Sequence, residues 1–350
     1  MRTVIATIGV LAAIAAATIL PGPGAASACA GVFSADGNVN LGRTTTLAGY
    51  HDGIEHYVTS FEFTGGGGGE FGTLIPLPGI PSNVERGGDW TLQRLQQETA
   101  PRIKAESADA LFAAAPAGVE VLQEVRIDAL DLTVLRGGGP DVAVWAQEHG
   151  FRLSPDTPEV LDFYAQRSPI FLAAVFDGQA ALDLGQDVGD GTPVHITIPT
   201  ENPWVPLRIL SLGKQATEIV QADVFLLTDR QPALLPVLEP GLDRTHSAPA
   251  TDLLLADLRS DAGMGWVPES AWLTKIEVNS SAADLHYDLA IDASGNANPS
   301  RIAAGLDLVT NVPNVTPDGS SWPTAWLWLG AIGALIAAVA ARQRFAGARN

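Results

Sequence analysis

The sequence is almost without cysteine: Cys29 is the single cysteine among 350 residues. One cysteine cannot form an intramolecular disulfide bond, and zinc motifs built from paired cysteines are excluded as well. The fold must therefore be held together by its hydrophobic core, which a chain of this length is large enough to bury. Lipid attachment at Cys29 is an open alternative, although Ala26 rather than leucine stands three residues before it.

Basic residues are scarce too, with 20 Lys and Arg against 39 Asp and Glu. Four of the bases lie near the two ends of the chain, so residues 29–321 hold 16 bases against 39 acids, a net charge of about −23. Such a surface repels phosphate backbones and anionic lipid headgroups, which disfavours nucleic-acid binding. The simplest interpretation is that the charge keeps an exported domain soluble.

Catalytic and cofactor motifs are missing. The sequence has no His-Glu-x-x-His, no Cys-x-x-Cys and no Gly-x-Ser-x-Gly, which are typical of metalloproteases, redox or metal sites and serine hydrolases. A phosphate-loop spacing at residues 67–73 lacks its lysine and favours a flexible loop instead. A carboxylate pair for glycoside hydrolysis cannot be chosen from sequence, because folding sets the separation of the two groups. We therefore predict no catalytic residue, no cofactor and no nucleotide partner.

The first 28 residues predict a secretory signal peptide. Arg2 gives a positive start, residues 4–20 are uncharged and apolar, and Ala26 and Ala28 are the small residues that a signal peptidase requires. Cleavage after Ala28 would leave Cys29 as the first mature residue. An uncleaved anchor is the alternative, and it would leave the rest of the chain on the same side of the membrane.

A second apolar stretch lies near the C-terminus. Residues 324–341 carry no charge, and as a helix they would be about 27 Å long, close to the ~30 Å apolar thickness of a bilayer. Three tryptophans crowd its start and three arginines follow it: Trp322, Trp326, Trp328, Arg342, Arg344 and Arg349. Indoles favour the headgroup interface and arginines the cytoplasmic side, so we predict a transmembrane helix at 322–341 and a basic cytoplasmic tail at 342–350. A buried core helix and a cell-wall sorting signal are the alternatives, but no Leu-Pro-x-Thr-Gly precedes the stretch.

Strand patterns dominate between the two ends. We expect strands at residues 43–50, 56–63, 71–77, 119–136 with a break near Ala129, 170–176, 194–198, 207–212, 219–228, 272–278 and 285–291. Asp52-Gly53 predicts a hairpin turn between the first two strands, and the last two should form another hairpin. Helices are expected from Asp89 as N-cap to Pro101 with Trp90 buried, over 140–149 and 157–164, and around 251–258.

These elements predict an α+β fold, a mainly antiparallel sheet or sandwich with a few packed helices and one C-terminal transmembrane helix. Residues 29–231 would form an extracellular core domain. Residues 232–292 would form its C-terminal part, with the second hairpin. Residues 293–321, rich in Asn, Pro, Ser and Gly, would be a juxtamembrane linker.

Three groups of residues are possible metal ligands. Asp284, His286 and Asp288 would lie on one strand face about 7 Å apart, although an exposed edge face is the simpler explanation. His51, Asp52, Glu55 and His56 are four possible ligands around the first hairpin, where a turn is the simpler explanation. Asp183, Asp187 and Asp190 lack calcium-loop spacing and predict a solvated turn. A lone histidine, His195, is expected at the surface.

Several motifs resemble a known family. They are Leu74-Ile75-Pro76-Leu77-Pro78, Thr99-Ala100-Pro101, Trp145 with His149-Gly150-Phe151, Phe163-Tyr164, Pro169-Ile170-Phe171-Leu172 and Pro206-Leu207-Arg208. In order and spacing, residues 29–230 are similar to the bacterial domain of unknown function 2330. Members often begin the mature chain with Cys-Gly-Gly and carry further cysteines, whereas this chain has Cys29-Ala30-Gly31. The resemblance implies an exported, often membrane-tethered protein, and it implies no activity, ligand or catalytic residue.

Three functional hypotheses follow. The first is a non-enzymatic, membrane-anchored extracellular protein that binds a partner or has a structural role at the cell envelope. The second is an extracellular hydrolase whose acidic residues converge only on folding. The third is an envelope protein that binds a divalent cation through Asp284, His286 and Asp288.

Overall fold

The computed structural model describes residues 31–34, 40–64, 71–100, 120–149, 151–177, 192–238, 241–292 and 298–308. The segments predicted as signal peptide, transmembrane helix and basic tail lie outside these residues, as do Cys29, residues 67–70, the Asp183 group and most of the predicted linker. Among the helices that the structure describes, none is long and apolar enough to cross a membrane.

The largest sheet, sheet B, has seven strands in the order β13-β14-β11-β2-β3-β9-β5. Their bounds are β2 (Asn40–His51), β3 (Ile54–Thr64), β5 (Asn83–Arg86), β9 (Val194–Pro199), β11 (Ile219–Thr228), β13 (Leu242–Pro249) and β14 (Trp272–Ser281). Neighbours pair antiparallel except β2 and β11, which are parallel. The expected preference for antiparallel sheet is thus confirmed.

A second sheet, sheet A, is antiparallel throughout, in the order β1-β4-β8-β7-β6. Its strands are β1 (Gly31–Ser34), β4 (Phe71–Pro76), β6 (Glu120–Ile127), β7 (Leu130–Arg136) and β8 (Ile170–Phe176). The continuously apolar β8 is buried along its whole length, as expected of a central strand. The break predicted near Ala129 is the turn between β6 and β7, where Asp128 has a φ of 50°.

A small third sheet, sheet C, consists of β10 (Trp204–Val205), β15 (Leu289–Asp292) and β12 (Ala233–Leu235) in the order β10-β15-β12. The hairpin predicted for residues 272–278 and 285–291 is wrong, because β14 pairs with β11 and β13 whereas β15 pairs with β10 and β12. The strand predicted at 207–212 is wrong too. A 3₁₀ turn, η1 (Arg208–Ser211), takes its place because the backbone N–H groups there bond to buried side chains.

In the described ranges, four helices accompany the sheets: α1 (Thr91–Thr99), α2 (Gly139–Glu148), α3 (Thr157–Ala165) and α5 (Asp252–Ser260). Val142, Trp145 and Ala146 of α2 are buried on one face of the helix, and Thr251 caps α5 by accepting a hydrogen bond from Leu254 N–H. Asp89 does not cap α1. The carboxylate of Asp261 accepts hydrogen bonds from Trp90 N–H and the Thr91 hydroxyl instead, and Trp90 is 39% exposed rather than buried.

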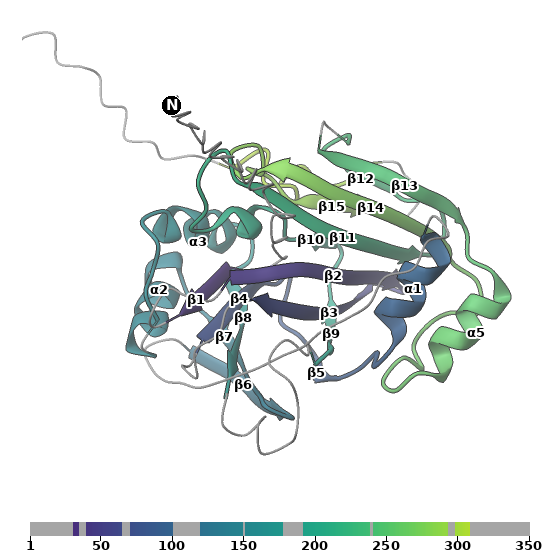
Figure 1. The fold of residues 1–350 in the computed structure, drawn as a ribbon, viewed down its shortest axis with the longest axis horizontal. Coiled ribbons are helices and arrows are strands. Elements are labelled where there is room, and N and C mark those ends of the chain that lie inside the picture. The colour runs from purple at the N-terminus through teal and green to yellow at the C-terminus, as the bar shows by residue number, and fades with distance from the viewer. Residues whose placement is uncertain are drawn as a thin grey trace, which may run out of the picture. The chain divides into compact units, whose positions relative to one another are not determined.

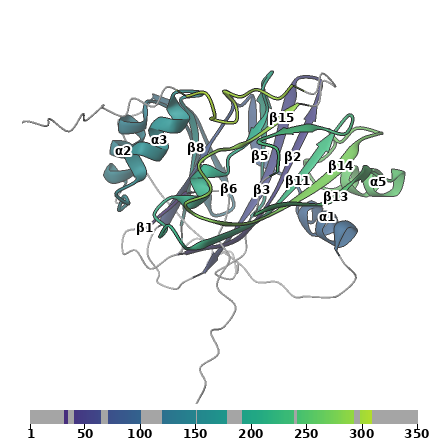
Figure 2. The same cartoon turned by 90° about the horizontal axis from the view of Figure 1, so that it is seen from above.

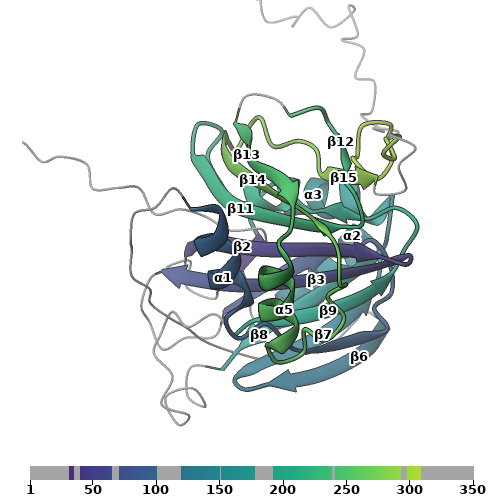
Figure 3. The ribbon, with the colours of Figure 1, turned by 90° about the vertical axis from the view of Figure 1, so that its right-hand side faces the viewer.

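Hydrophobic clusters define four layers, as Figure 2 shows: α2 and α3, then sheets A and C, then sheet B, then α1 and α5. Alternate residues of sheet C contribute to the clusters on either side of it, so it continues the layer of sheet A. Figure 1 shows the two helix pairs at opposite sides of the sheets. In Figure 3, α1 and α5 lie in front of sheet B.

Candidate functional site

The β2–β3 hairpin brings together the first set of titratable side chains. Asp52 and Gly53 have φ angles of 48° and 77°, as a tight hairpin turn requires, so the predicted hairpin is confirmed. Side chains alternate along β3, which turns His56 toward α1 and α5 but Glu55 toward the interior between the sheets. The predicted ligand group around this hairpin therefore does not converge on one point.

On the α1/α5 face of sheet B, a row of side chains crosses five neighbouring strands. We call it the histidine row: Asp229, His51, His56, His195 and Glu85. His51 Nδ1 lies 2.6 Å from Asp229 Oδ1, His56 Nδ1 lies 3.0 Å from His195 Nε2, and His195 Nδ1 lies 3.3 Å from Glu85 Oε1. The row thus consists of three imidazoles with one carboxylate at each end.

Trp266 covers the middle of the histidine row. Its indole stacks on the His56 ring at 4.0 Å with an interplanar angle of 1°. Gly49 makes room for it, because a Cβ at that position would lie 2.3 Å from the indole. His195, expected at the surface, is only 2% exposed, since Gly87 and Trp266 pack against it.

Burial keeps the imidazoles of His56 and His195 neutral. It lowers the pKa of His56 to about 3, and the neighbouring His195 and His51 act in the same direction. Burial also lowers the pKa of His195, with Glu85 opposing the shift. Neutral imidazoles are suitable metal ligands. Within the described ranges, however, no group of three His, Cys, Asp or Glu side chains is placed to hold a metal ion.

On the opposite face of the same hairpin lies a buried carboxyl group. Glu55 is 0% exposed, and neither of its oxygens has a hydrogen-bond partner among the residues that the structure describes. Burial raises the pKa of Glu55 to about 8, an effect that the nearby backbone N–H of Trp204 partly opposes. Glu55 is therefore mostly protonated at neutral pH.

Tyr50 pairs directly across from Glu55 and is half-buried. Its hydroxyl donates a hydrogen bond of 3.0 Å to the carbonyl oxygen of Thr200. Burial raises the pKa of Tyr50, and four carboxyl groups add to the increase: Glu55, Glu201, Asp292 and Asp229. Carboxyl groups on both faces of the hairpin therefore act on Tyr50.

The three residues predicted as a cation site do not share a strand face, because β15 begins only at Leu289. Asp284 accepts a 2.6 Å hydrogen bond from the Ser281 hydroxyl at the surface, and the His286 ring contacts Tyr287 edge-on. Asp288 alone is fully buried. The expected spacing along one face was wrong, since residues 284–288 form an irregular turn.

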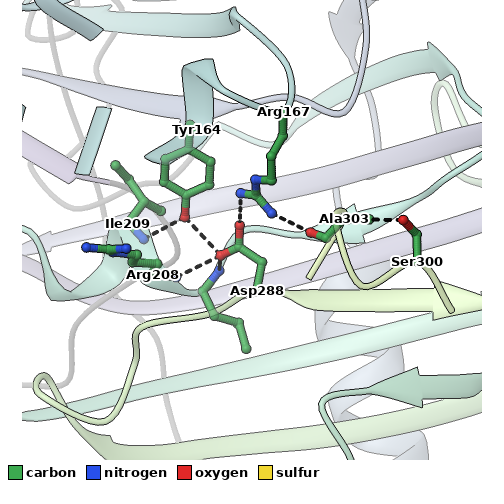
Figure 4. Close-up of polar contacts among 8 residues, drawn as sticks. Tyr164, Arg167, Arg208, Ile209, Asp288, Ser300 and Ala303 are labelled. Carbon is green, nitrogen blue, oxygen red and sulfur yellow. Dashed lines mark hydrogen bonds and ion pairs between the residues drawn. The ribbon is translucent and has the colours of Figure 1, made fainter. Parts of the chain in front are cut away.

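Asp288 is the centre of a polar network that Figure 4 shows. Its Oδ1 accepts hydrogen bonds from the Tyr164 hydroxyl at 2.9 Å and from the backbone N–H groups of Leu207 at 2.7 Å and Arg208 at 2.9 Å. Its Oδ2 pairs with the Arg167 guanidinium. Both oxygens therefore have donors already, which leaves Asp288 a structural role.

Aromatic rings enclose the Arg167 side of this network. The guanidinium carbon lies 4.4 Å from the ring centroids of Phe163 and Trp204 and 4.9 Å from that of Tyr164. A second N–H group of Arg167 donates to the carbonyl oxygen of Ala303. Burial beside Asp288 raises the pKa of Tyr164 well above its usual range. The network thus joins α3, η1 and the segment 298–308 in the interior.

Sequence reasoning named Glu55 only as a possible ligand at the hairpin and did not predict its burial, and it missed Tyr50, Trp266 and Arg167. For Glu55 a signal was present, because alternation along the strand places it on the same face as Tyr57, Phe61 and Phe63. For Arg167 and Trp266 we find no local signal, since their partners come from distant segments.

Fold and site together define a sheet-dominated α+β domain with few helices and no recognisable catalytic centre in its described part. Residues 23–231, more than half of the chain, match the model of a family described as an uncharacterized protein conserved in bacteria, domain of unknown function 2330. The protein belongs to this family, which confirms the resemblance noted from its motifs. No curated protein and no solved structure matches the chain.

Proposed function

We propose that this protein is a membrane-anchored extracellular protein that binds a partner at the bacterial cell envelope. Three features of the sequence support this: a signal-like N-terminus, an apolar stretch at 324–341 with tryptophans before it and arginines after it, and the acidic composition of the segment between.

The observation that carries the proposal is that segment 298–308, the C-terminal end of the described domain, is hydrogen-bonded to the buried core. Segment 298–308 directly precedes the chain that leads to the apolar stretch. Arg167 holds the carbonyl of Ala303, and Asp288 N–H donates a 3.0 Å hydrogen bond to Ala304. Breaking a buried ion pair such as Arg167–Asp288 costs about 3–5 kcal/mol. A pull on the C-terminal chain would therefore be transmitted to the core, as a tethered domain requires.

A hydrolase is the second candidate, and one observation favours it. Glu55 has the raised pKa of about 8 that a carboxylic acid needs to act as a proton donor at neutral pH. Its carboxyl group is fully buried, however, and the buried Asp288 is occupied by its own donors. Binding is therefore the function that the geometry supports better.

Extraction of membranes tests the tether. Membranes from cells that produce the full chain are washed with alkaline carbonate, and a variant that lacks residues 322–350 is treated in parallel. We expect the full chain to stay in the membrane pellet and the shortened chain to be released. Release of the full chain by carbonate would refute membrane anchoring.

Crosslinking on intact cells tests the binding role. A membrane-impermeant crosslinker should join the full chain to a discrete partner at the cell surface. As a control, purified protein lacking residues 322–350 is added to the outside of cells, which tests whether crosslinking to the partner requires the anchor. If the full chain gains no crosslinked species while a known surface protein does, the binding role is wrong.

A further inference from the structure

Strand β6 forms one edge of sheet A. It pairs with β7 on one side, and no other described strand pairs with it. An edge strand directs every second N–H and C=O group away from its sheet, where a further strand can bind them. β6 is eight residues long and contains neither proline nor glycine. In Figure 3 it lies at the outer edge of the fold, so its outer side is open to a partner strand.

The other sheet edges in the described ranges are less suited to pairing. β1 and β5 have four residues each, and β10 and β12 in sheet C have two and three. β13 has eight residues, but it ends in a proline and its register shifts within the strand. Short strands, prolines and irregular register are the features by which native sheets block edge pairing. β6 has one such shift, between Val121 and Gln123, which leaves residues 123–127 as a regular edge.

Residues 123–127 alternate between the two faces of sheet A. Val125 pairs across the strands with Leu132, a residue of the core between sheets A and B, so Val125 faces that core. Glu124 and Arg126, on either side of it in sequence, therefore lie on the opposite face, and both are exposed. A carboxylate and a guanidinium thus stand two residues apart on one face of an open strand.

These two charges differ in their existing contacts. The Arg126 guanidinium lies 2.5 Å from an Asp131 oxygen and 2.9 Å from an Asp177 oxygen, whereas Glu124 has no ion-pair partner among the described residues. Arginine has five N–H donors, so these two contacts leave Arg126 donors for a third carboxylate. The edge therefore offers both an acceptor and donors to a partner strand of complementary charge.

A second copy of β6 has that charge pattern in one particular register. A two-fold axis that joins two antiparallel edges keeps each face of the sheet on its own side, so it passes through a residue rather than between two. An axis at Glu124 would place two carboxylates opposite each other, and an axis at Arg126 would do the same with two guanidinium groups. Like charges directly opposite each other are destabilising, and opposite charges are stabilising.

An axis at Val125 avoids both conflicts. It places Glu124 of each copy opposite Arg126 of the other copy, and the two Val125 side chains opposite each other. It also pairs all five residues of the regular edge, 123–127 with 127–123. The sequence of this edge is therefore complementary to itself in charge and in the alternation of its faces.

We propose that β6 pairs with β6 of a second copy of this chain, in the register centred on Val125, so that sheet A of one copy continues into sheet A of the other. Five residues per strand make a small contact, which needs a high local concentration of the two copies. Anchoring in one membrane supplies that concentration. The inference deepens the proposed function by naming the partner, and it rests on the proposed membrane anchor.

Disulfide crosslinking tests the register. The test uses native membranes rather than dilute detergent micelles, because anchored copies must meet. In a full-length chain carrying Cys29→Ser, the substitution Val125→Cys places one thiol in each copy directly opposite the other. We expect mild oxidation of these membranes to link the chains into dimers, and the Cys29→Ser chain alone to give none.

Val121→Cys in the same background is the matched control. Val121 is 41% exposed and Val125 is half-buried, so random collisions would link Val121→Cys more readily. In the proposed register, however, Val121 lies four residues from the axis in each copy, which separates the two thiols by about 26 Å along the strands. Thiols so far apart cannot form a disulfide bond. We therefore expect at least about tenfold more dimer from Val125→Cys.

Charge reversal tests the pairing of Glu124 with Arg126. Adding Glu124→Lys to the Val125→Cys chain places like charges opposite each other and should reduce the dimer at least about fivefold, as should Arg126→Glu. When the two reversed chains are produced together with different tags, their charges are complementary again, and mixed dimers should return. Glu148→Lys, at the exposed end of α2, makes the same change of charge elsewhere and should have no effect.

The proposal is overturned if Val125→Cys gives no more dimer than Val121→Cys, or if Glu124→Lys leaves the dimer unchanged. It is also overturned if Val125→Cys links to a different protein instead of its own copy, which would assign the edge to another partner. Membrane anchoring is judged separately by carbonate extraction. A chain that stays in the carbonate pellet but gives no Val125→Cys dimer refutes the pairing alone, whereas release by carbonate refutes the anchor.

Discussion

The buried Glu55 makes the stability of this protein depend on pH in a defined direction. Burial raises the pKa of Glu55 from 4.5 to about 8 in the folded protein. The folded state therefore binds a proton between these two pH values that the unfolded state has lost. Stability from this group is fully present below pH 4.5, and it is lost as the pH rises through about 8.

The size of the effect follows from the shift. At ~1.4 kcal/mol per pKa unit, Glu55 lowers the free energy of unfolding by roughly 5 kcal/mol between pH 4 and pH 9. Glutamine has nearly the same shape but does not ionise. The substitution Glu55→Gln should therefore remove this loss, so that the variant becomes increasingly more stable than the wild type as the pH rises.

Urea denaturation of the full chain in detergent micelles at pH 4 to 9, followed by tryptophan fluorescence, measures this difference. Only the difference between variant and wild type is used, because it cancels the titration of other groups. Glu124→Gln, an exposed carboxyl in β6, serves as control and should give a difference that does not change with pH. A constant difference for Glu55→Gln as well would show that Glu55 is not buried as described.

Three further predictions concern other parts of the structure. Arg167→Met leaves Asp288 buried without its counter-ion and should lower the free energy of unfolding by about 3–5 kcal/mol, measured by urea denaturation. Gly49→Ala places a methyl group where Trp266 lies and should lower the free energy of unfolding by about 1–3 kcal/mol and shift the tryptophan emission. Because burial lowers the pKa of His56 to about 3, its imidazole NMR signals should not change between pH 8 and pH 5.

Matched controls accompany these variants. Arg301→Met removes an exposed ion pair with Asp307, which water screens, and should leave the free energy of unfolding almost unchanged. A methyl group at Gly265 meets open space, so Gly265→Ala should be close to neutral. Equal losses in a variant and its control, or titration of His56 near pH 6.5, would contradict the packing described here.

Local patterns predicted the elements that depend on local physics. The apolar run of β8, the Asp52-Gly53 turn and the buried stripe of α2 are all encoded by neighbouring residues. The hairpin predicted with residues 285–291 was wrong because its pairing depends on distant segments. The alternation of this segment is real, since Leu285, Tyr287 and Leu289 are buried, but Asp288 N–H bonds to Ala304 and β15 pairs with β10 and β12 rather than with β14.

The candidate site was harder to predict, because sequence periodicity shows which residues share a face but not what covers that face. His195 alternates with apolar neighbours and was therefore expected at the surface. The face that it occupies is covered by Trp266, which comes from the loop between α5 and β14, about 70 residues later in the chain. Tyr50 bonds to Thr200 in the same non-local way, and Glu55 lies beside Trp204 N–H.

Protease treatment of whole cells tests the central claim, that the acidic domain lies outside a membrane which the C-terminal segment spans. Cells producing the chain with a reporter fused after Asn350 are exposed to protease, before and after permeabilisation. The account predicts that residues 29–321 are degraded on intact cells while the reporter is degraded only after permeabilisation. Survival of the domain together with loss of the reporter on intact cells would contradict it.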